Sequence, residues 1–253
     1  MDPRSKAAVI TGAASGIGLA LAEALAAEGC PLVLADRDER RLGVQADRLR
    51  SSGASVVAVP TDVADPDAVD ALSARSHEAF GSVGLLCNNA GVVAAGRAWE
   101  IPVDTWHEVV GVNLMGAVHG IRSFVPAMID AGGPGHVVNV ASMAAVVPVP
   151  GIAPYNVTKH GLLALSETLQ ADLEQAGADI GVTVVMPGRV ATALGRPVER
   201  SDDPPGPLEP GVLSPAVVAA QIVAAVRAGR RHLFTHPERL VEVEARFARI
   251  LST

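Results

Sequence analysis

Short apolar runs rich in β-branched residues alternate with longer amphipathic stretches along this chain, and this alternation limits the fold more than any other feature. The predicted strands are Ala7–Thr11, Pro31–Asp36, Ser55–Pro60, Gly84–Asn88, His136–Ala141, Gly181–Met186 and a short His232–Thr235. Apolar residues at helical spacing predict helices over Gly16–Glu28, Glu39–Ser51, Pro66–Phe80, Val103–Ala131, Pro154–Ala176 and Pro215–Ala228. The alternation predicts an α/β fold with a doubly wound, parallel sheet of seven strands and helices on both faces.

The length and composition are those of one domain. About half of the 253 residues are apolar, enough for a large core, and no repeat or linker divides the chain. Residues 1–253 are therefore predicted to form a single domain. Residues 193–213 interrupt the alternation and are rich in Pro, Gly and Asp. Such a segment is either a plain surface loop or a lid over the substrate, and both interpretations stay open.

Charge and hydropathy exclude several partners. The formal net charge is −7, and basic residues form only isolated pairs, so we expect no nucleic-acid partner. No apolar run approaches the roughly 20 residues of a membrane span. The N-terminal segment is too short for the apolar core of a signal peptide. We therefore expect a cytoplasmic protein without membrane association.

The residues that bind metals or form disulfides are too few and too far apart to indicate such a site. Cys30 and Cys87 show no CxxC or Cys/His spacing, so both are predicted to be buried, reduced thiols. His232 and His236 have a metal-binding spacing only in a helix. The strand-like run around them and Pro237 argue against a helix, so no metal site is predicted.

A glycine-rich turn joins the first predicted strand to the first helix, with the sequence Thr11-Gly12-Ala13-Ala14-Ser15-Gly16-Ile17-Gly18. Glycines allow the backbone to approach a pyrophosphate, whose charge then faces the N–H groups and dipole of the helix. Glycines also form ordinary tight turns. The position between first strand and first helix favours a dinucleotide site and a Rossmann-type fold.

Asp36 ends the second predicted strand. A carboxylate there can accept hydrogen bonds from the adenine ribose hydroxyls; the alternatives are a solvated charge or a cap for the next helix. We favour the ribose contact, which predicts NAD over NADP because a 2′-phosphate would face the carboxylate. Arg37 keeps NADP open, since its guanidinium can bind a phosphate. Its alternative interpretation is a solvated arginine near Asp38 and Glu39.

The GxxxGxG spacing and several later motifs resemble the classical short-chain dehydrogenase/reductase (SDR) family over nearly the whole chain. These motifs are Asp62-Val63, Asn88-Asn89-Ala90-Gly91, Val112-Asn113-Leu114, Ser142, Tyr155-Asn156-Val157-Thr158-Lys159 and Pro187-Gly188. The resemblance implies hydride transfer between NAD(P) and a secondary alcohol or ketone. It also implies cofactor contacts by Gly12, Ser15, Gly16, Ile17, Gly18, Asp36, Arg37, Asp62, Val63, Asn88, Asn89, Ala90, Gly91, Tyr155, Lys159, Pro187, Gly188, Val190 and Thr192.

Tyr155 and Lys159 are four residues apart on a predicted helix, so their side chains share one face. The ammonium and a cationic nicotinamide ring would both favour the phenolate, so we predict that the pKa of Tyr155 falls into the range of a general acid/base. Ser142 can donate a hydrogen bond to the substrate oxygen. The alternative for Tyr155 is a core tyrosine with a satisfied hydroxyl.

The resemblance adds two roles in the catalytic set. Lys159 would also hold the nicotinamide ribose, and Asn113 would anchor a water molecule that links Lys159 to solvent. A helix-interior asparagine bonded to backbone is the alternative for Asn113.

The segments expected around the substrate are largely apolar. They are Val92–Ala95, Met143–Val149 and the loop after Thr192, with Arg189 and Arg196 as the only obvious anion partners. Small pockets lined in this way favour an apolar alcohol or ketone over a phosphorylated one. Arg189 is unexpected after Pro-Gly, and it can either reach the substrate or lie in solvent.

Assembly is predicted from two helices. Val103–Ala131 and Pro154–Ala176 carry more apolar residues than one buried face requires, and in the resembled family these helices pair with their symmetry mates. A homodimer or homotetramer is therefore expected. The chain departs from the family after the last strand, where His232–Pro237 leads into another amphipathic helix instead of a glycine-rich end. The family's contacts at that end cannot be transferred.

Two other classes of function share this fold. One is a non-catalytic dinucleotide sensor, and the other an epimerase or dehydratase. Sensors usually lose the tyrosine or the lysine, and the other enzymes show changes around the Ser–Tyr–Lys set. This chain keeps Ser142, Tyr155 and Lys159, which favours a dehydrogenase.

Overall fold

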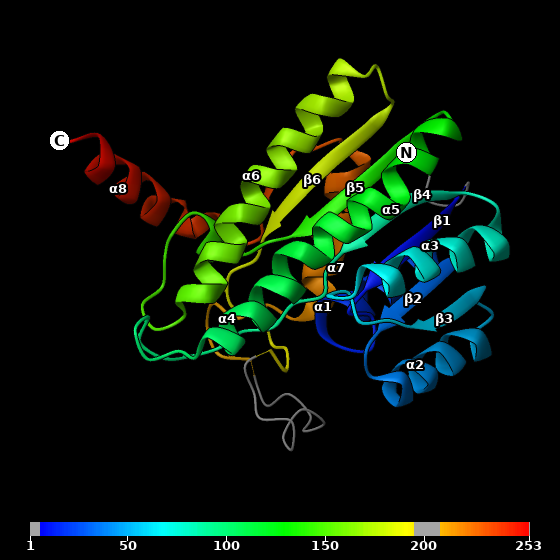
Figure 1. The fold of residues 1–253 in the computed structure, drawn as a ribbon, viewed down its shortest axis with the longest axis horizontal. Coiled ribbons are helices and arrows are strands. Elements are labelled where there is room, and N and C mark those ends of the chain that lie inside the picture. The colour runs from blue at the N-terminus through cyan, green and yellow to red at the C-terminus, as the bar shows by residue number, and fades with distance from the viewer. Residues whose placement is uncertain (1–5, 195–207, 253) are drawn as a thin grey trace.

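A computed structural model describes residues 6–194 and 208–252. Seven parallel strands form one sheet in the order β3-β2-β1-β4-β5-β6-β7 (Figure 1). They are β1 (Ala7–Thr11), β2 (Leu32–Asp36), β3 (Val56–Pro60), β4 (Val83–Asn88), β5 (Gly135–Val140), β6 (Ile180–Met186) and β7 (His232–Phe234). The predicted seven-stranded parallel sheet is confirmed. The strand order reverses between β1 and β4, which opens a crevice at the carboxyl ends of these strands.

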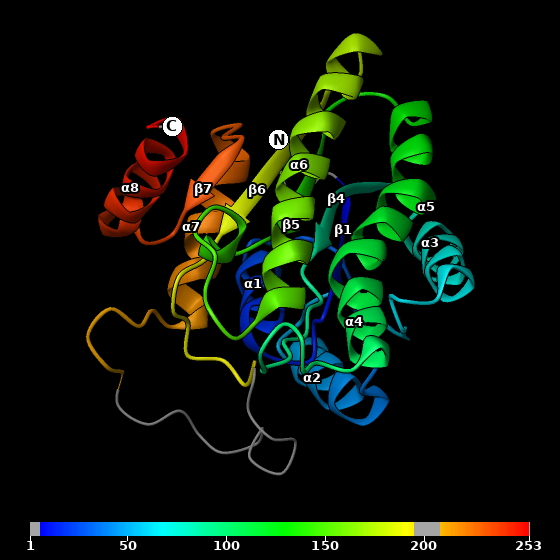
Figure 2. The ribbon, with the colours of Figure 1, turned by 60° about the vertical axis from the view of Figure 1, so that its left-hand side comes forward.

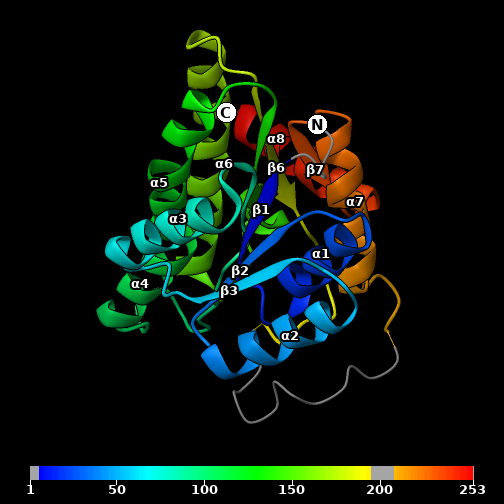
Figure 3. The ribbon, with the colours of Figure 1, turned by 90° about the vertical axis from the view of Figure 1, so that its right-hand side faces the viewer.

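Helices cover both faces of the sheet, as Figures 2 and 3 show. They are α1 (Gly16–Ala27), α2 (Glu39–Ser51), α3 (Pro66–Phe80), α4 (Val103–Val110), α5 (Gly116–Asp130), α6 (Ala153–Gln175), α7 (Pro215–Arg227) and α8 (Leu240–Leu251). Strand residues alternate between two core clusters because successive side chains point to opposite faces. Ile10 belongs to the core cluster that includes side chains of α1, α2 and α7, whereas Val9 belongs to the cluster that includes side chains of α3, α5 and α6.

The predicted single helix over Val103–Ala131 is wrong in its interior. A π-helical turn, Gly111–Met115, separates α4 from α5. Two neighbours explain the irregularity. The side-chain amide of Asn113 forms hydrogen bonds with the backbone of Val92. Gly116 packs so closely against Val63 that a Cβ atom on Gly116 would lie 2.8 Å from Val63 Cγ2. Such turns are frequent at functional sites.

The chain after β7 forms the amphipathic helix that the sequence predicts, but β7 ends at Phe234, one residue earlier than expected. A short 3₁₀ turn, Pro237–Arg239, precedes α8, which extends from the edge of the molecule (Figure 1). Val243 packs against the body, and the Arg246 guanidinium donates to the Val146 carbonyl at 2.8 Å.

Cys30 and Cys87 are buried thiols, as predicted. In residues 6–194 and 208–252, no helix is long and apolar enough to cross a membrane. Within the same ranges, no group of three or more His, Cys, Asp or Glu side chains is arranged to hold a metal ion.

Candidate active site

An open cleft of about 1010 Å³ lies at the carboxyl ends of the strands, at the point where the strand order reverses. Its walls come from the loops that follow β1, β2, β3, β4, β5 and β6. Most of the site residues predicted from the sequence line it: Gly12, Ser15, Gly16, Ile17, Asp36, Arg37, Asp62, Val63, Asn89, Ala90, Gly91, Ser142, Tyr155, Lys159, Pro187, Gly188, Val190 and Thr192.

The glycine turn brings the backbone to the cleft floor. Gly12 and Gly16 have φ angles of +66° and +56°, and a Cβ on Gly12 would lie 2.9 Å from the Ala90 Cα. Ser15 begins α1 without a side-chain hydrogen bond to the helix. In contrast, Asp38, Asp65 and Ser214 cap α2, α3 and α7. The first N–H groups of α1 are thus left for a partner in the cleft, as an anion site requires.

Two predicted cofactor contacts lie outside the cleft wall. Gly18 serves packing, because a Cβ there would lie 2.3 Å from the Gly12 carbonyl oxygen. Asn88 is buried and donates to the side chain of Asn139 at 2.9 Å. The next residue, Asn89, donates its amide to the Thr11 carbonyl at 2.9 Å and lines the cleft. Successive residues at a strand end point in opposite directions, so only one of the two asparagines can face the cleft.

The Asp36 carboxylate is held by two backbone N–H groups, those of Ala14 and Asp38, each at 3.0 Å. The N-cap of α2 is Asp38, which accepts from the Arg41 N–H at 2.9 Å, so Asp36 is not that cap. Its oxygens are oriented at the cleft wall, where the ribose of a dinucleotide would approach.

Arg37 lies 3.9 Å from Glu108 of α4, and both side chains are more than half exposed. Sequence reasoning missed Glu108 because it is an exposed position of an amphipathic helix, and only the packing of α4 brings it to the cleft. Thr61 and Ala191 also line the cleft, and sequence reasoning did not single them out because each is an ordinary residue in a loop after a strand. Leu208 and Val212 line it from the segment predicted as a loop or lid.

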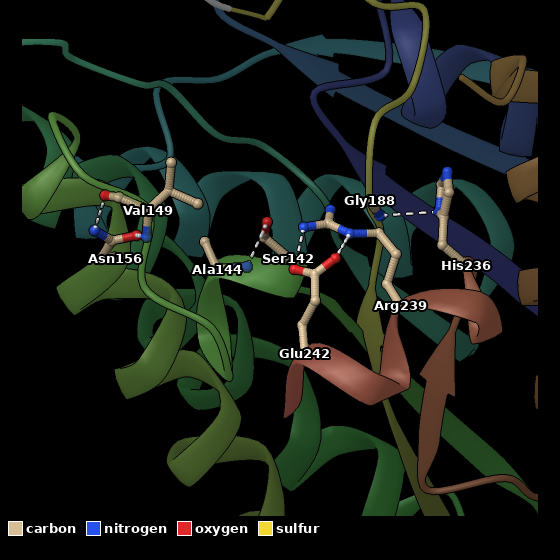
Figure 4. A network of polar contacts seen from close by, with 8 residues as sticks. All are labelled: Ser142, Ala144, Val149, Asn156, Gly188, His236, Arg239 and Glu242. Carbon is tan, nitrogen blue, oxygen red and sulfur yellow. Dashed lines mark hydrogen bonds and ion pairs between the residues drawn. The ribbon is translucent and has the colours of Figure 1, made fainter. Parts of the chain in front are cut away.

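Ser142, Tyr155 and Lys159 gather on one side of the cleft. Ser142 follows β5, and its hydroxyl oxygen accepts from the Ala144 N–H at 3.1 Å (Figure 4). That contact leaves the serine proton for another acceptor. Tyr155 and Lys159 stand one turn apart near the start of α6 and are buried. The Lys159 ammonium donates to the Val140 carbonyl at 2.8 Å and lies 5.4 Å from the centre of the Tyr155 ring.

The predicted fall in the pKa of Tyr155 is not found in the protein alone. Burial raises the pKa of Tyr155 above its ordinary value, and a hydrogen bond with Ser142 opposes this only in part. Desolvation penalises the phenolate more than its neighbours stabilise it. Burial also lowers the pKa of Lys159, to about 8.

Asn113 is 2 % exposed and does not line the cleft. Its side chain accepts from the Val92 N–H at 2.7 Å and donates to the Val92 carbonyl at 2.9 Å and to the Thr158 hydroxyl at 3.2 Å. It therefore joins the segment after β4 to α6. The backbone it bonds belongs to that segment and not to its own helix.

The segments predicted around the substrate divide into two groups. Val92 and Val93 line the cleft, whereas Met143–Val146 is buried in a core cluster with Leu162 and Met186. Asn156 holds the backbone of Val149 by two hydrogen bonds (Figure 4). The Arg189 guanidinium lies at the cleft wall, largely exposed, and pairs with Glu209 at 2.7 Å. Arg196 and residues 195–207 of the predicted lid lie outside the described residues.

Comparisons with family models, known sequences and solved structures all match the same family. The model of the short chain dehydrogenase family matches residues 6–203. The 1-deoxy-11-beta-hydroxypentalenate dehydrogenase of Streptomyces avermitilis is 41% identical over 198 residues, covering 78% of this chain and 73% of that protein.

Two solved structures are similar along most of their length. A short chain dehydrogenase/reductase from Burkholderia phymatum in complex with NAD has a TM-score of 0.92 and 39% identity, covering 99% of this chain and 95% of that one. An alcohol dehydrogenase from Thermococcus sibiricus complexed with 5-hydroxy-NADP has a TM-score of 0.81 and 30% identity, covering 90% and 95%. The chain belongs to the short-chain dehydrogenase/reductase family, whose members are oxidoreductases that act on hydroxyl groups with NAD(P) as the cofactor.

Proposed function

We propose that this protein is an NAD-preferring dehydrogenase that interconverts a largely apolar secondary alcohol and its ketone. The observation that carries the proposal is the placement of Ser142, Tyr155 and Lys159 in the same cleft as the oriented Asp36 carboxylate. Acid/base groups and a ribose-binding carboxylate at one strand edge are what hydride transfer from a bound dinucleotide requires.

The residues of the cleft fit a dinucleotide. The uncapped start of α1 would take the pyrophosphate, and Asp36 the adenine ribose. Lys159 would hold the other ribose, and Thr192 the nicotinamide carboxamide. When bound, the nicotinamide accepts or supplies the hydride. The remaining wall contacts would come from Asp62, Val63, Asn89, Ala90, Gly91, Pro187, Gly188 and Val190.

The chain's own residues would handle the proton and the substrate oxygen. The Ser142 oxygen already accepts from Ala144, so its proton is available to the substrate oxygen and stabilises charge that develops there. Tyr155 takes the proton of the alcohol during oxidation and returns it during reduction. With a pKa lowered to about 8, Lys159 is mostly cationic at neutral pH, and its charge next to the ring favours the phenolate needed during the reaction.

Two charges support the preference for NAD. Asp36 would face a 2′-phosphate, and like charges in a poorly solvated site cost several kcal/mol. Arg37, which could bind that phosphate, lies beside Glu108. A carboxylate next to the guanidinium makes it a weaker phosphate ligand and adds a second negative charge at this end of the cleft.

Several apolar side chains support an apolar substrate. Val92, Val93, Val112, Leu194 and Val212 contribute to the walls of the cleft. The similar protein from Streptomyces avermitilis is named as the dehydrogenase of a hydroxypentalenate, and a hydroxyl is the group that the proposed reaction oxidises. Arg189 is paired with Glu209, so it is not an unopposed anion site. We propose that the segment 193–213 contributes the substrate lid.

We further propose that the protein is a cytoplasmic homodimer or homotetramer. The helices predicted to pair carry exposed apolar side chains: Val103 of α4 is 66% exposed, and Val157 of α6 is 54% exposed. Burying them against a symmetry mate would remove apolar surface from water.

The test is absorbance at the reduced-nicotinamide band with a panel of steroids, polyols, sugars and acyl thioesters, each with NAD and NADP. We expect turnover on an apolar alcohol or ketone, faster with NAD. Preference for a phosphorylated or highly charged substrate would contradict the substrate class. Dinucleotide binding without any absorbance change would indicate a sensor, and product formed without net absorbance change an epimerase or dehydratase.

A further inference from the structure

His236 contacts Gly188, a residue of the proposed cofactor site, although His236 itself does not line the cleft. It lies two residues after the end of β7 and is 2 % exposed. Its backbone carbonyl accepts from the Arg239 N–H at 3.0 Å, and Arg239 itself forms two 2.7 Å hydrogen bonds with Glu242 at the start of α8. These contacts fix the backbone at His236, and its imidazole faces Gly188 in the turn that follows β6 (Figure 4).

The imidazole contacts that turn at one atom. His236 Nδ1 accepts from the Gly188 N–H at 3.1 Å, which is shorter than the 3.4 Å from the same N–H to the Thr235 hydroxyl. The Thr235 hydroxyl lies 2.7 Å from Nδ1. An N–H donor at Nδ1 assigns the proton of the neutral ring to Nε2. Nε2 is buried, and no residue in the described part of the chain bonds it. Nδ1 is thus the nitrogen through which the ring holds the backbone.

Gly188 lies between the imidazole and the cleft. It lines the cleft, while a Cβ atom on it would lie 2.8 Å from His236 Cγ and Nδ1. On the other side of the turn, the Pro187 carbonyl accepts from the Met143 N–H at 2.8 Å. The turn is therefore fixed at two successive residues, one bonded to the segment after β5 and the other to His236.

We propose that His236 is a positioning residue for dinucleotide binding, acting through its Nδ1 on the Gly188 N–H. This inference rests on the proposed function, because it assumes that the turn from Pro187 to Thr192 contacts the dinucleotide. Without Nδ1, the partly buried Gly188 N–H keeps only the long 3.4 Å contact with the Thr235 hydroxyl, and a poorly paired donor is costly. The turn then shifts to reach water, and a bound dinucleotide must reverse that shift, so affinity falls.

The test uses three variants of the full chain that differ in the position of the side-chain atom at residue 236 that can accept from the Gly188 N–H. His236→Asn keeps an acceptor at the δ position, His236→Gln moves it to the ε position, and His236→Leu removes it. His232→Asn is the matched control, since His232 begins β7, four residues earlier, and its exposed ring contacts Glu167. The dissociation constant for NADH is measured by fluorescence, and hydrogen exchange is followed in the peptide that contains Gly188.

We expect His236→Asn and His232→Asn to bind within about threefold of the wild type. His236→Gln and His236→Leu should bind about tenfold more weakly or worse and lose protection at Gly188. If His236→Leu fails to fold, the Asn and Gln variants alone decide, because they share size class and polarity. Equal affinities for Asn and Gln, or unchanged protection at Gly188, would overturn the role of Nδ1. Absence of NADH binding by the wild type would instead overturn the proposed function, while exchange at Gly188 would still report whether His236 holds the turn.

Discussion

The Lys159 ammonium lies 5.4 Å from the centre of the Tyr155 ring and donates to the Val140 carbonyl, and both side chains are buried. The charge therefore stands beside the phenol without bonding its oxygen. Burial raises the pKa of the phenol and lowers that of the ammonium. Proton transfer at Tyr155 and the protonation of Lys159 are therefore both open to direct measurement.

Tyr155→Phe should remove turnover and leave dinucleotide binding nearly intact, because the hydroxyl serves proton transfer and the ring still fills its place. General acid/base groups contribute typically 10²–10⁴-fold. Turnover is measured with any working substrate, and binding by NADH fluorescence. A variant that keeps more than about a tenth of the wild-type turnover would contradict the mechanism.

Lys159 should make the stability of the cofactor-free protein depend on pH. Its folded pKa is lowered to about 8 from 10.5, so between these values the unfolded chain binds more protons than the folded one. Stability should therefore rise with pH in this window, and below pH 8 the buried ammonium costs about 3 kcal/mol.

The measurement is urea unfolding of the wild type and Lys159→Met from pH 7 to 10. The unfolding free energy of the wild type minus that of the variant should increase with pH. A difference that stays constant, or falls, across this range would show that the ammonium is not destabilised by burial.

Asp36→Asn should shift the kcat/KM ratio toward NADP by about tenfold or more. The amide removes the negative charge that a 2′-phosphate would meet and can still accept from Ala14 or Asp38. Asp65→Asn, which alters only the cap of α3, is the control and should leave the ratio unchanged. Equal or better wild-type values with NADP would show that Arg37, and not Asp36, sets the preference.

Glu108 supplies a second test of the same preference. Glu108→Gln should improve kcat/KM with NADP while leaving that with NAD nearly unchanged, because the Arg37 guanidinium loses its neighbouring carboxylate. The effect should be a few-fold, since exposed ion pairs contribute about 0–1 kcal/mol. Combining Glu108→Gln with Arg37→Gln should abolish the gain, and an undiminished gain in the double variant would mean that Glu108 acts independently of Arg37.

Asn113→Ala should destabilise the fold by about 2 kcal/mol, because the partly buried Val92 N–H and carbonyl both lose their hydrogen-bond partner. Asn156→Ala is a matched control. Asn156 makes the same pair of hydrogen bonds to Val149, but at an exposed site where water can replace it, so its loss should cost under about 1 kcal/mol. Similar unfolding free energies for the two variants would refute this difference.

Static light scattering at micromolar concentration should show a dimer or tetramer. Val157→Lys, on the exposed face of α6, should shift the protein toward monomer because it places a charge in the predicted interface. Val241→Lys, on the exposed side of α8, should leave the assembly intact. A wild type that is only monomeric would refute the assembly.

The seven-stranded parallel sheet and the strand edge that carries the cleft followed from the sequence because they depend on local signals. Nearly continuous apolar runs indicate strands that are covered on both faces, as in a parallel sheet. The glycine turn between the first strand and the first helix indicates where the backbone approaches a ligand. Tyr155 and Lys159 share a face through helical spacing alone. Gly12, Asp36 and Ser142 could be placed at one sheet edge because the carboxyl ends of parallel strands meet there.

Tertiary packing decided what spacing cannot express. It directed Asn89 into the cleft and Asn88 toward Asn139, turned Asn113 inward through a π-helical turn, and brought Glu108 to Arg37. It also placed His236 behind Gly188, although 48 residues separate them. Local sequence encodes periodicity and turn chemistry, whereas the direction of one side chain and the desolvation of Tyr155 depend on every element packed around them.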